Sequence, residues 1–242
     1  MKPLHSLLLP LLALTFTACV SDSQTRTNEA PPAAPQVGAD AKLNKVFLDK
    51  NLDVAQFTER FEGESREVYA KRTEIADALN LKPGMAIADI GSGTGLFLKH
   101  FAERVGEDGL VYAVEISPVF VKHLRGRAEK EGLPQVQAML CGQRSADLPD
   151  RSVDVAFICD TYHHFEYPAD TLASLFSAIR PGGQLVVVDF ERIPGKTRQW
   201  LLDHVRAGKE VFRAEIEAAG FELIEEVDVG LEENYFLRFR RP

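Results

Sequence analysis

The stretch that decides the fold is Met85-Ala-Ile-Ala-Asp89-Ile-Gly91-Ser92-Gly93-Thr-Gly95-Leu-Phe-Leu-Lys-His100. An apolar run reaches an acidic residue, three alternating glycines follow, and apolar residues then recur at helical spacing through Phe101 and Val105. This order predicts a buried strand, a tight turn and a helix. Because glycines carry no Cβ, such a turn brings bare N–H groups close to a ligand near the positive end of the helix.

The glycine spacing is Gly-x-Gly-x-Gly, whereas dinucleotide-binding proteins use Gly-x-Gly-x-x-Gly. A carboxylate two residues before the first glycine suits a ligand with a cationic end better than a pyrophosphate. The segment resembles the first motif of the class I S-adenosylmethionine-dependent methyltransferases. The resemblance implies S-adenosylmethionine as the cofactor and assigns to its site Asp89, Gly91, Ser92, Gly93 and Gly95. The alternative is a turn that needs its glycines only for packing.

A second apolar run, Leu110–Glu115, ends in a carboxylate twenty residues beyond Gly95. In a doubly wound sheet the second strand lies beside the first, so Glu115 is expected at the ribose hydroxyls of a ligand in the glycine turn. The alternative is a charged strand end without a ligand.

A third strand is predicted at Val136–Leu140, followed by a polar loop over residues 141–150. In the methyltransferase family this loop reaches the adenine ring, commonly through an acidic side chain and a main-chain N–H. The resemblance places Gly142 and Gln143 at the matching positions, so a side-chain amide replaces the acid. Asp147 is the second candidate.

A fourth strand, Val153–Cys159, is followed by Asp160-Thr-Tyr162-His163-His164. Ligands of open α/β sheets bind outside the carboxyl ends of the first and fourth strands, so this run is expected to line the pocket. The resemblance places Asp160 near the methionine part of the cofactor. Tyr162, His163 and His164 are the candidate catalytic residues, one histidine acting as a general base for an acceptor because imidazole titrates near neutral pH.

Strand alternation would turn neighbouring side chains to opposite sides, so at most one of the two histidines is expected in the pocket, with His163 favoured. The alternative is that the histidines fill space, bond the main chain or cap the next helix.

The remaining pattern completes one α/β domain over residues 42–242 with an N-terminal helical cap. Helices are predicted at 46–81 in two segments, 118–131, 168–179, 199–205 and 209–219, and strands at 184–190, 221–229 and 235–240. The last two strands form a hairpin, which methyltransferases have and ordinary dinucleotide-binding sheets lack. We therefore predict a Rossmann-like, doubly wound, seven-stranded methyltransferase sheet, mostly parallel with an antiparallel C-terminal strand.

Composition limits the partners. Hydrophobic residues make up 45% of the chain and the formal charge is −8, so nucleic acid is an unlikely substrate. Cys141 and Cys159 end strands that are not neighbours, so free thiols are expected. The sequence has no Cys/His cluster at metal-ligand spacing, and no metal site is predicted.

The N-terminus reads as a signal peptide over residues 1–18, because its apolar run is too short to span a bilayer. Phe16-Thr-Ala-Cys19 is close to the bacterial lipoprotein box, which predicts acylation of Cys19 and membrane attachment through the lipid. Residues 19–41 are rich in Ser, Thr, Pro and Ala and are predicted to be a disordered tether. The protein is thus expected to be an exported, periplasmic lipoprotein; the alternative is an ordinary secretory signal or an apolar N-terminus.

The expected function is transfer of a methyl group from S-adenosylmethionine to an acceptor that the sequence does not identify. The longer pattern also looks like a group of exported bacterial methyltransferase-domain proteins. One alternative is an exported, non-catalytic module that keeps this fold. An NAD-dependent oxidoreductase fits less well, because the glycine spacing and the closing hairpin differ.

The lipoprotein hypothesis is tested by feeding labelled palmitate to a bacterial host that expresses the full chain. We expect incorporation into the wild type and none into Cys19→Ser, because the thiol accepts the first lipid. Equal labelling of both proteins would exclude Cys19 as the site.

Overall fold

The computed structural model describes residues 38–63 and 66–242. The predicted signal peptide, Cys19 and most of the predicted tether lie outside these residues. The helices are α1 (Val54–Phe61), α2 (Glu67–Ala70), α3 (Arg72–Ala78), α4 (Leu98–Val105), α5 (Pro118–Glu131), the 3₁₀ turn η1 (Tyr162–His164), α6 (Pro168–Ala178), α7 (Gln199–His204) and α8 (Lys209–Ala218). The strands are β1 (Ala86–Ile90), β2 (Leu110–Glu115), β3 (Val136–Leu140), β4 (Val153–Cys159), β5 (Ile179–Phe190), β6 (Glu222–Glu226) and β7 (Asn234–Arg240). Among the described helices, none is long and apolar enough to cross a membrane.

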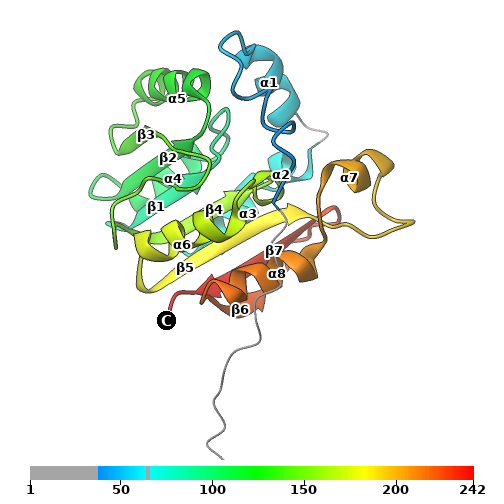
Figure 1. Ribbon diagram of the computed structural model, residues 1–242. Coiled ribbons are helices and arrows are strands. Elements are labelled where there is room, and N and C mark those ends of the chain that lie inside the picture. The colour runs from blue at the N-terminus through cyan, green and yellow to red at the C-terminus, as the bar shows by residue number, and fades with distance from the viewer. Residues whose placement is uncertain (1–37, 64–65) are drawn as a thin grey trace, which may run out of the picture. The chain divides into compact units, whose positions relative to one another are not determined.

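The seven strands form one sheet in the order β3-β2-β1-β4-β5-β7-β6 (Figure 1). The first five of these strands pair in parallel, whereas β7 lies antiparallel between β5 and β6. The chain order reverses between β1 and β4, so the carboxyl ends of these two strands form the crevice in which open α/β sheets bind ligands. The predicted doubly wound sheet with its antiparallel C-terminal strand is confirmed.

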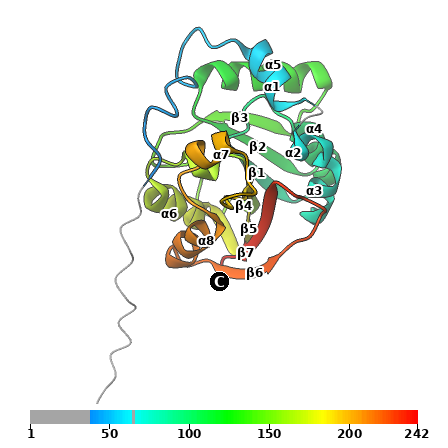
Figure 2. The ribbon, with the colours of Figure 1, turned by 90° about the vertical axis from the view of Figure 1, so that its right-hand side faces the viewer.

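Helices cover both faces of the sheet, with α6 and α8 on one side and α3 and α4 on the other (Figure 2). The central strands are therefore buried on both faces and read as continuous apolar runs. Neighbouring residues of one strand enter opposite cores, as in the pairs Ile87 and Ala88, Phe157 and Ile158, and Val186 and Val187.

Local signals explain the helix boundaries. The hydroxyl of Ser117 accepts from the N–H of Phe120 and Pro118 opens α5, while Gly132 ends it at φ +66°. This helix has the predicted bounds. Strand β5 begins earlier than predicted, at Ile179, and its pairing with β4 is irregular near Gly182, where φ is +80°.

The N-terminal segment, defined here as residues 38–63, differs most from expectation. Helix α1 begins only at Val54, where Asp53 caps it, and residues 41–48 form turns instead of helix. Ala39 falls within the predicted tether, yet it is buried and its N–H donates to the carbonyl of Phe165 at 2.8 Å. The segment therefore packs on the domain from its first described residues.

Candidate functional site

The glycine turn after β1 requires glycine for two reasons. Gly91, Gly93 and Gly95 all have positive φ, at +73°, +54° and +93°. A Cβ on Gly91 would lie 2.3 Å from Cγ2 of Thr161, and one on Gly95 would lie 2.9 Å from a methyl of Leu124. The turn therefore holds the ends of β1 and β4 against each other.

Glu115 lies at this turn, as the sequence predicts. Its Oε2 accepts from the N–H of Gly93 at 2.9 Å, and its Oε1 accepts from the N–H groups of Ile116 and Ser117 at 2.8 and 2.9 Å. Burial raises the pKa of this carboxyl, while the three N–H donors oppose the shift. The end of β2 thus places an acceptor directly beside the glycines.

Asp89 lies beneath the same turn and is only 3% exposed. The hydroxyl of Ser92 donates to the Asp89 carbonyl at 2.9 Å, which fixes the first bend of the turn. Burial raises the pKa of the Asp89 carboxyl to about 7, and the nearby charge of Glu115 adds to the shift. A cation placed here would favour the ionised form, so the pair of carboxyls suits a ligand with a positive charge.

The loop after β3 is exposed. The N–H of Gly142 donates to Oδ2 of Asp147 at 2.9 Å, and the Gln143 amide lies 3.4 Å from Oε1 of Glu166. Asp147, the second candidate for the adenine side, thus accepts a hydrogen bond from Gly142, which belongs to the first-ranked pair Gly142 and Gln143.

Asp160 is held between two distant parts of the chain. Arg66 forms an ion pair with its Oδ2, and the amide of Asn234 donates to its Oδ1 at 2.6 Å. Asp160 has φ +46°, and burial raises its pKa to about 6 although Arg66 opposes the shift. The turn after β4 is therefore fixed by Arg66, which precedes α2, and by Asn234 at the start of β7.

Tyr162 does not line the site. Its ring is fully buried in the core beside Phe212, and its hydroxyl donates to Oε2 of Glu215 at 2.9 Å. Burial and Glu215 together raise the pKa of this phenol. The expected pocket role of Tyr162 is thus corrected, because the chain turns its side chain inward onto α8.

Both histidines instead face one cluster, which we call the histidine cluster: His163, His164 and His204. Ring centroids of His163 and His164 lie 4.3 Å apart, and each lies 5.1 Å from that of His204. The expectation that the two histidines point apart is wrong, because the chain leaves the strand and residues 162–164 form a 3₁₀ turn. Helix α7, which carries His204, lies at the carboxyl ends of the strands (Figures 1 and 2).

Hydrogen bonds orient the first two rings. His163 Nδ1 lies 2.7 Å from Oδ1 of the fully buried Asp189, and His164 Nδ1 lies 3.1 Å from Oδ1 of Asn44. Burial lowers the pKa of His164 to about 2, with His163 and His204 adding to the shift, and burial lowers the pKa of His204. These two rings are therefore neutral at neutral pH.

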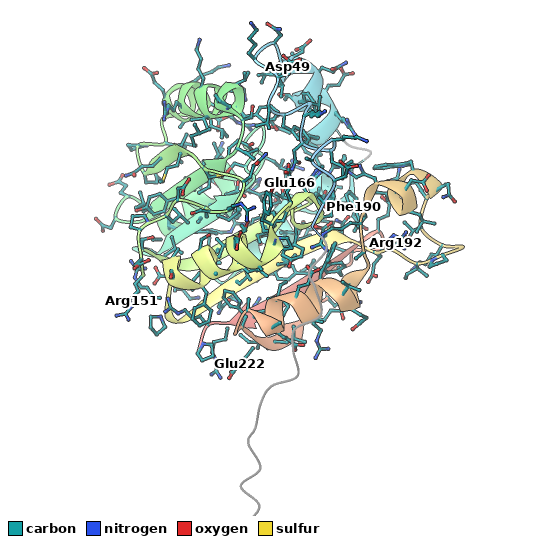
Figure 3. The ribbon with its side chains drawn as sticks, viewed as in Figure 1. Asp49, Arg151, Glu166, Phe190, Arg192 and Glu222 are labelled. Carbon is teal, nitrogen blue, oxygen red and sulfur yellow. The ribbon has the colours of Figure 1, made fainter. Side chains whose placement is uncertain are left out.

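The surroundings of the cluster are aromatic and polar. Phe190 lies 5.8 Å from the His163 ring, and Glu166 accepts from the Asn44 amide at 2.8 Å; both are labelled in Figure 3. Phe47 meets the His164 ring edge-on at 5.4 Å. The cluster is thus enclosed by the N-terminal segment, η1, β5 and α7.

Helix α1 covers the glycine turn. A Cβ on Gly93 would lie 3.7 Å from the Phe61 ring, and Glu62 accepts from the hydroxyl of Thr94 at 2.7 Å and from Arg127 at 2.6 Å. Two surface hollows lie elsewhere, one between α1 and α5 and one beside β6 and β7. Phe61 and Glu62 thus cover the glycine turn at Gly93 and Thr94.

Several residues of the site escaped the sequence analysis. Asp189 follows the apolar run Leu185–Val188 and is the last residue but one of β5, near the strand end as Glu115 is in β2, so it carried a usable signal. No sequence signal pointed to Asn44, Glu62 or His204, because each reaches the site only through tertiary packing.

Comparison with known proteins agrees with this geometry. Residues 88–187 match the family model described as a methyltransferase domain. This part of the chain therefore resembles a methyltransferase domain. The comparisons support S-adenosylmethionine as the cofactor of this domain.

Curated relatives match about half of this chain. A ubiquinone/menaquinone biosynthesis C-methyltransferase of Paraburkholderia phymatum is 30% identical over 123 residues, which is 51% of this chain and 50% of that protein. An uncharacterized 37.1 kDa protein in a transposon of Streptomyces fradiae is 34% identical over 116 residues, 48% of this chain and 33% of that protein. The chain spans about half the length, or less, of these relatives.

Solved structures share the fold. A SAM-dependent methyltransferase from Aquifex aeolicus has a TM-score of 0.69 at 24% identity and covers 77% of this chain and 97% of its own. The [4+2]-cyclase SpnF has a TM-score of 0.65 at 18% identity, covering 86% and 98%. The fold therefore also occurs in a protein named for a different reaction.

The buried Asp89 makes stability depend on pH. Its folded pKa of about 7 lies above the value of about 3.9 for an unfolded chain, so its contribution is fully present below about pH 4 and is lost as pH rises through 7. We expect the melting temperature of the wild type, relative to Asp89→Asn, to fall by several degrees between about pH 4 and pH 7. Thermal unfolding followed by circular dichroism measures the difference.

Asp108→Asn, at an exposed position, is the control and should show a constant difference. A difference between wild type and Asp89→Asn that does not change with pH would contradict the raised pKa.

Proposed function

We propose that this protein transfers the methyl group of S-adenosylmethionine to an acceptor bound beside the carboxyl ends of β4 and β5. The observation that carries the proposal is the meeting of Glu115 with the N–H of Gly93, at the crevice where the strand order reverses. Bound S-adenosylmethionine supplies an activated methyl sulfonium, so the protein's task is mainly to position the reactants and exclude water.

The residues present fit such a cofactor. The glycine turn lets a ligand approach the main chain, and Glu115 is an acceptor that suits ribose hydroxyls. Asp89 is buried with a raised pKa, so a cationic amino-acid end would stabilise its ionised form. Gly142 and Gln143 are assigned to the adenine side, and Asp160 to the methionine side.

Access to this site requires movement of α1. Phe61 lies over Gly93, and the contacts of Glu62 with Thr94 and Arg127 hold the helix there. We therefore propose that the N-terminal segment opens to admit the cofactor and closes again over it, which would exclude water from the reacting atoms.

The acceptor side is assigned to His163 and His164, with one of them serving as the base if the acceptor arrives protonated. Relatives named as ubiquinone/menaquinone biosynthesis C-methyltransferases make precursors of such quinones the first acceptors to assay. Export through the N-terminal leader and attachment through Cys19 remain part of the proposal.

A second candidate is a binding module that keeps the fold without the reaction. The position of Phe61 over Gly93 favours it. Binding of the cofactor separates the two candidates, because a methyltransferase must bind S-adenosylmethionine.

We expect the purified full chain to bind S-adenosylmethionine or its homocysteine product, and Glu115→Ala to weaken binding by about 1.5–3 kcal/mol, or roughly 10- to 150-fold in Kd. The loss follows from removing an acceptor of the ribose hydroxyls. Isothermal titration calorimetry measures it.

Because Glu115 also accepts from three backbone N–H groups, Glu115→Gln serves as a second variant that keeps the shape of the side chain. The exposed Glu107→Ala is the control. Unchanged affinity in folded Glu115 variants would remove this residue from the site, and a folded wild type that binds neither ligand would leave the binding module as the leading function.

A further inference from the structure

The histidine cluster has the composition and spacing of a metal-binding site. One ring nitrogen from each of His163, His164 and His204 lies within 4.8 Å of the other two. His163 is only 1% exposed, and the other two rings are partly buried. The sequence analysis found no such group, because His204 comes from α7, forty residues along the chain from His164.

Neighbouring groups occupy Nδ1 of two of the three rings. The Asp189 carboxylate can only accept from His163 Nδ1, so the neutral tautomer of this ring that fits the contact has its proton on Nδ1 and a lone pair on Nε2. Asn44 uses its NH₂ group on the His164 carbonyl and on Glu166, so its oxygen faces His164 Nδ1, and Nε2 of that ring is free as well. A carboxylate or carbonyl on the far nitrogen is what metal-binding histidines usually have.

Asp189 is itself rigidly held. Its Oδ1 also accepts from the N–H of Phe190 at 2.7 Å, and its Oδ2 accepts from the N–H of His163 at 3.2 Å. The fully buried carboxylate therefore brings a negative charge behind the His163 ring, which would offset part of the charge of a cation.

We propose that His163, His164 and His204 bind one divalent transition-metal ion, for which Zn²⁺ is the natural probe. Three imidazoles suit zinc, and three protein ligands leave a fourth position open, as in catalytic zinc sites. Zinc–nitrogen bonds of about 2.0–2.1 Å in tetrahedral geometry place the nitrogens about 3.4 Å apart. The rings must therefore move together slightly, and the partly buried His204, at the end of the six-residue α7, has room to do so.

The proposed ion would lie beside the region assigned to the acceptor. Thr161 contacts the glycine turn and His163 follows it by two residues, so the ion would lie between the cofactor site and α7. It would hold an oxygen, nitrogen or sulfur atom of the acceptor and favour its deprotonated form. This role rests on the proposed methyl transfer, whereas binding of the metal does not.

The competing explanation is an aromatic packing cluster. His204 lies 6.1 Å from the Trp200 ring, and Phe47 and Phe190 border the other two rings. Such packing explains the short distances between rings but does not require any metal affinity, so a binding measurement decides between the two.

The experiment uses the full chain purified without a histidine tag and stripped of metal with a chelator. Titration with Co²⁺ is followed by visible absorption, and Zn²⁺ binding is measured by equilibrium dialysis with elemental mass spectrometry. We expect one equivalent of metal, tetrahedral cobalt bands and a rise in melting temperature with Zn²⁺. His204→Ala should weaken Zn²⁺ binding by at least about 100-fold, and Asp189→Asn by about 10- to 100-fold.

The matched control is His100→Ala, a partly buried histidine on α4 outside the cluster, which should bind as the wild type does. Because His204 is not in the core, His204→Ala is expected to fold, and its melting temperature without metal checks this. A wild type that binds no metal, or a His204→Ala variant that binds like His100→Ala, would overturn the proposal. Calorimetry with S-adenosylmethionine on the same samples reports separately on the methyltransferase proposal.

Discussion

The structure depends on the close approach of three strand ends at one glycine turn. Gly91 packs directly on Thr161 after β4, and Gly93 donates its N–H to Glu115 at the end of β2. A side chain at Gly91 would separate β1 from β4, and that separation would displace η1 with both of its histidines. The candidate cofactor site and the histidine cluster therefore share one steric constraint.

Buried carboxyls at the carboxyl ends of strands are the recurring chemical feature of this crevice. Glu115 ends β2, Asp89 and Asp189 are the last residues but one of β1 and β5, and Asp160 follows β4. Two of these four carboxyls have a basic side chain as partner. Asp160 forms an ion pair with Arg66, and Asp189 is hydrogen-bonded to His163. Among the described residues, Asp89 and Glu115 have only backbone N–H groups or a hydroxyl as partners. Burial raises the pKa of both carboxyls. Among the described residues, a cation therefore faces Asp160 but not Asp89 or Glu115.

The features that local sequence patterns determine could be predicted from the sequence. The apolar runs, the three glycines and the carboxyl end of Leu110–Glu115 predicted the sheet and the position of Glu115, because strand periodicity and connection rules fix both. The direction of His163 and His164 was predicted wrongly, since Asp160 takes a positive φ and the chain leaves the strand. Tyr162 could not be placed in the core from its sequence neighbours, because its partners lie on α8.

The N-terminal segment links the two sites physically. Asn44 orients the His164 ring, while Glu62, eighteen residues later, fastens α1 to Thr94 and Arg127 beside the glycine turn. Phe47 and Phe57 lie between these contacts and pack on Phe120 of α5. A movement of α1 that admits a cofactor would therefore displace the part of the N-terminal segment that carries Asn44. Because coupling between two sites is reciprocal, whatever orders the histidine cluster through Asn44 would in turn favour the closed position of α1.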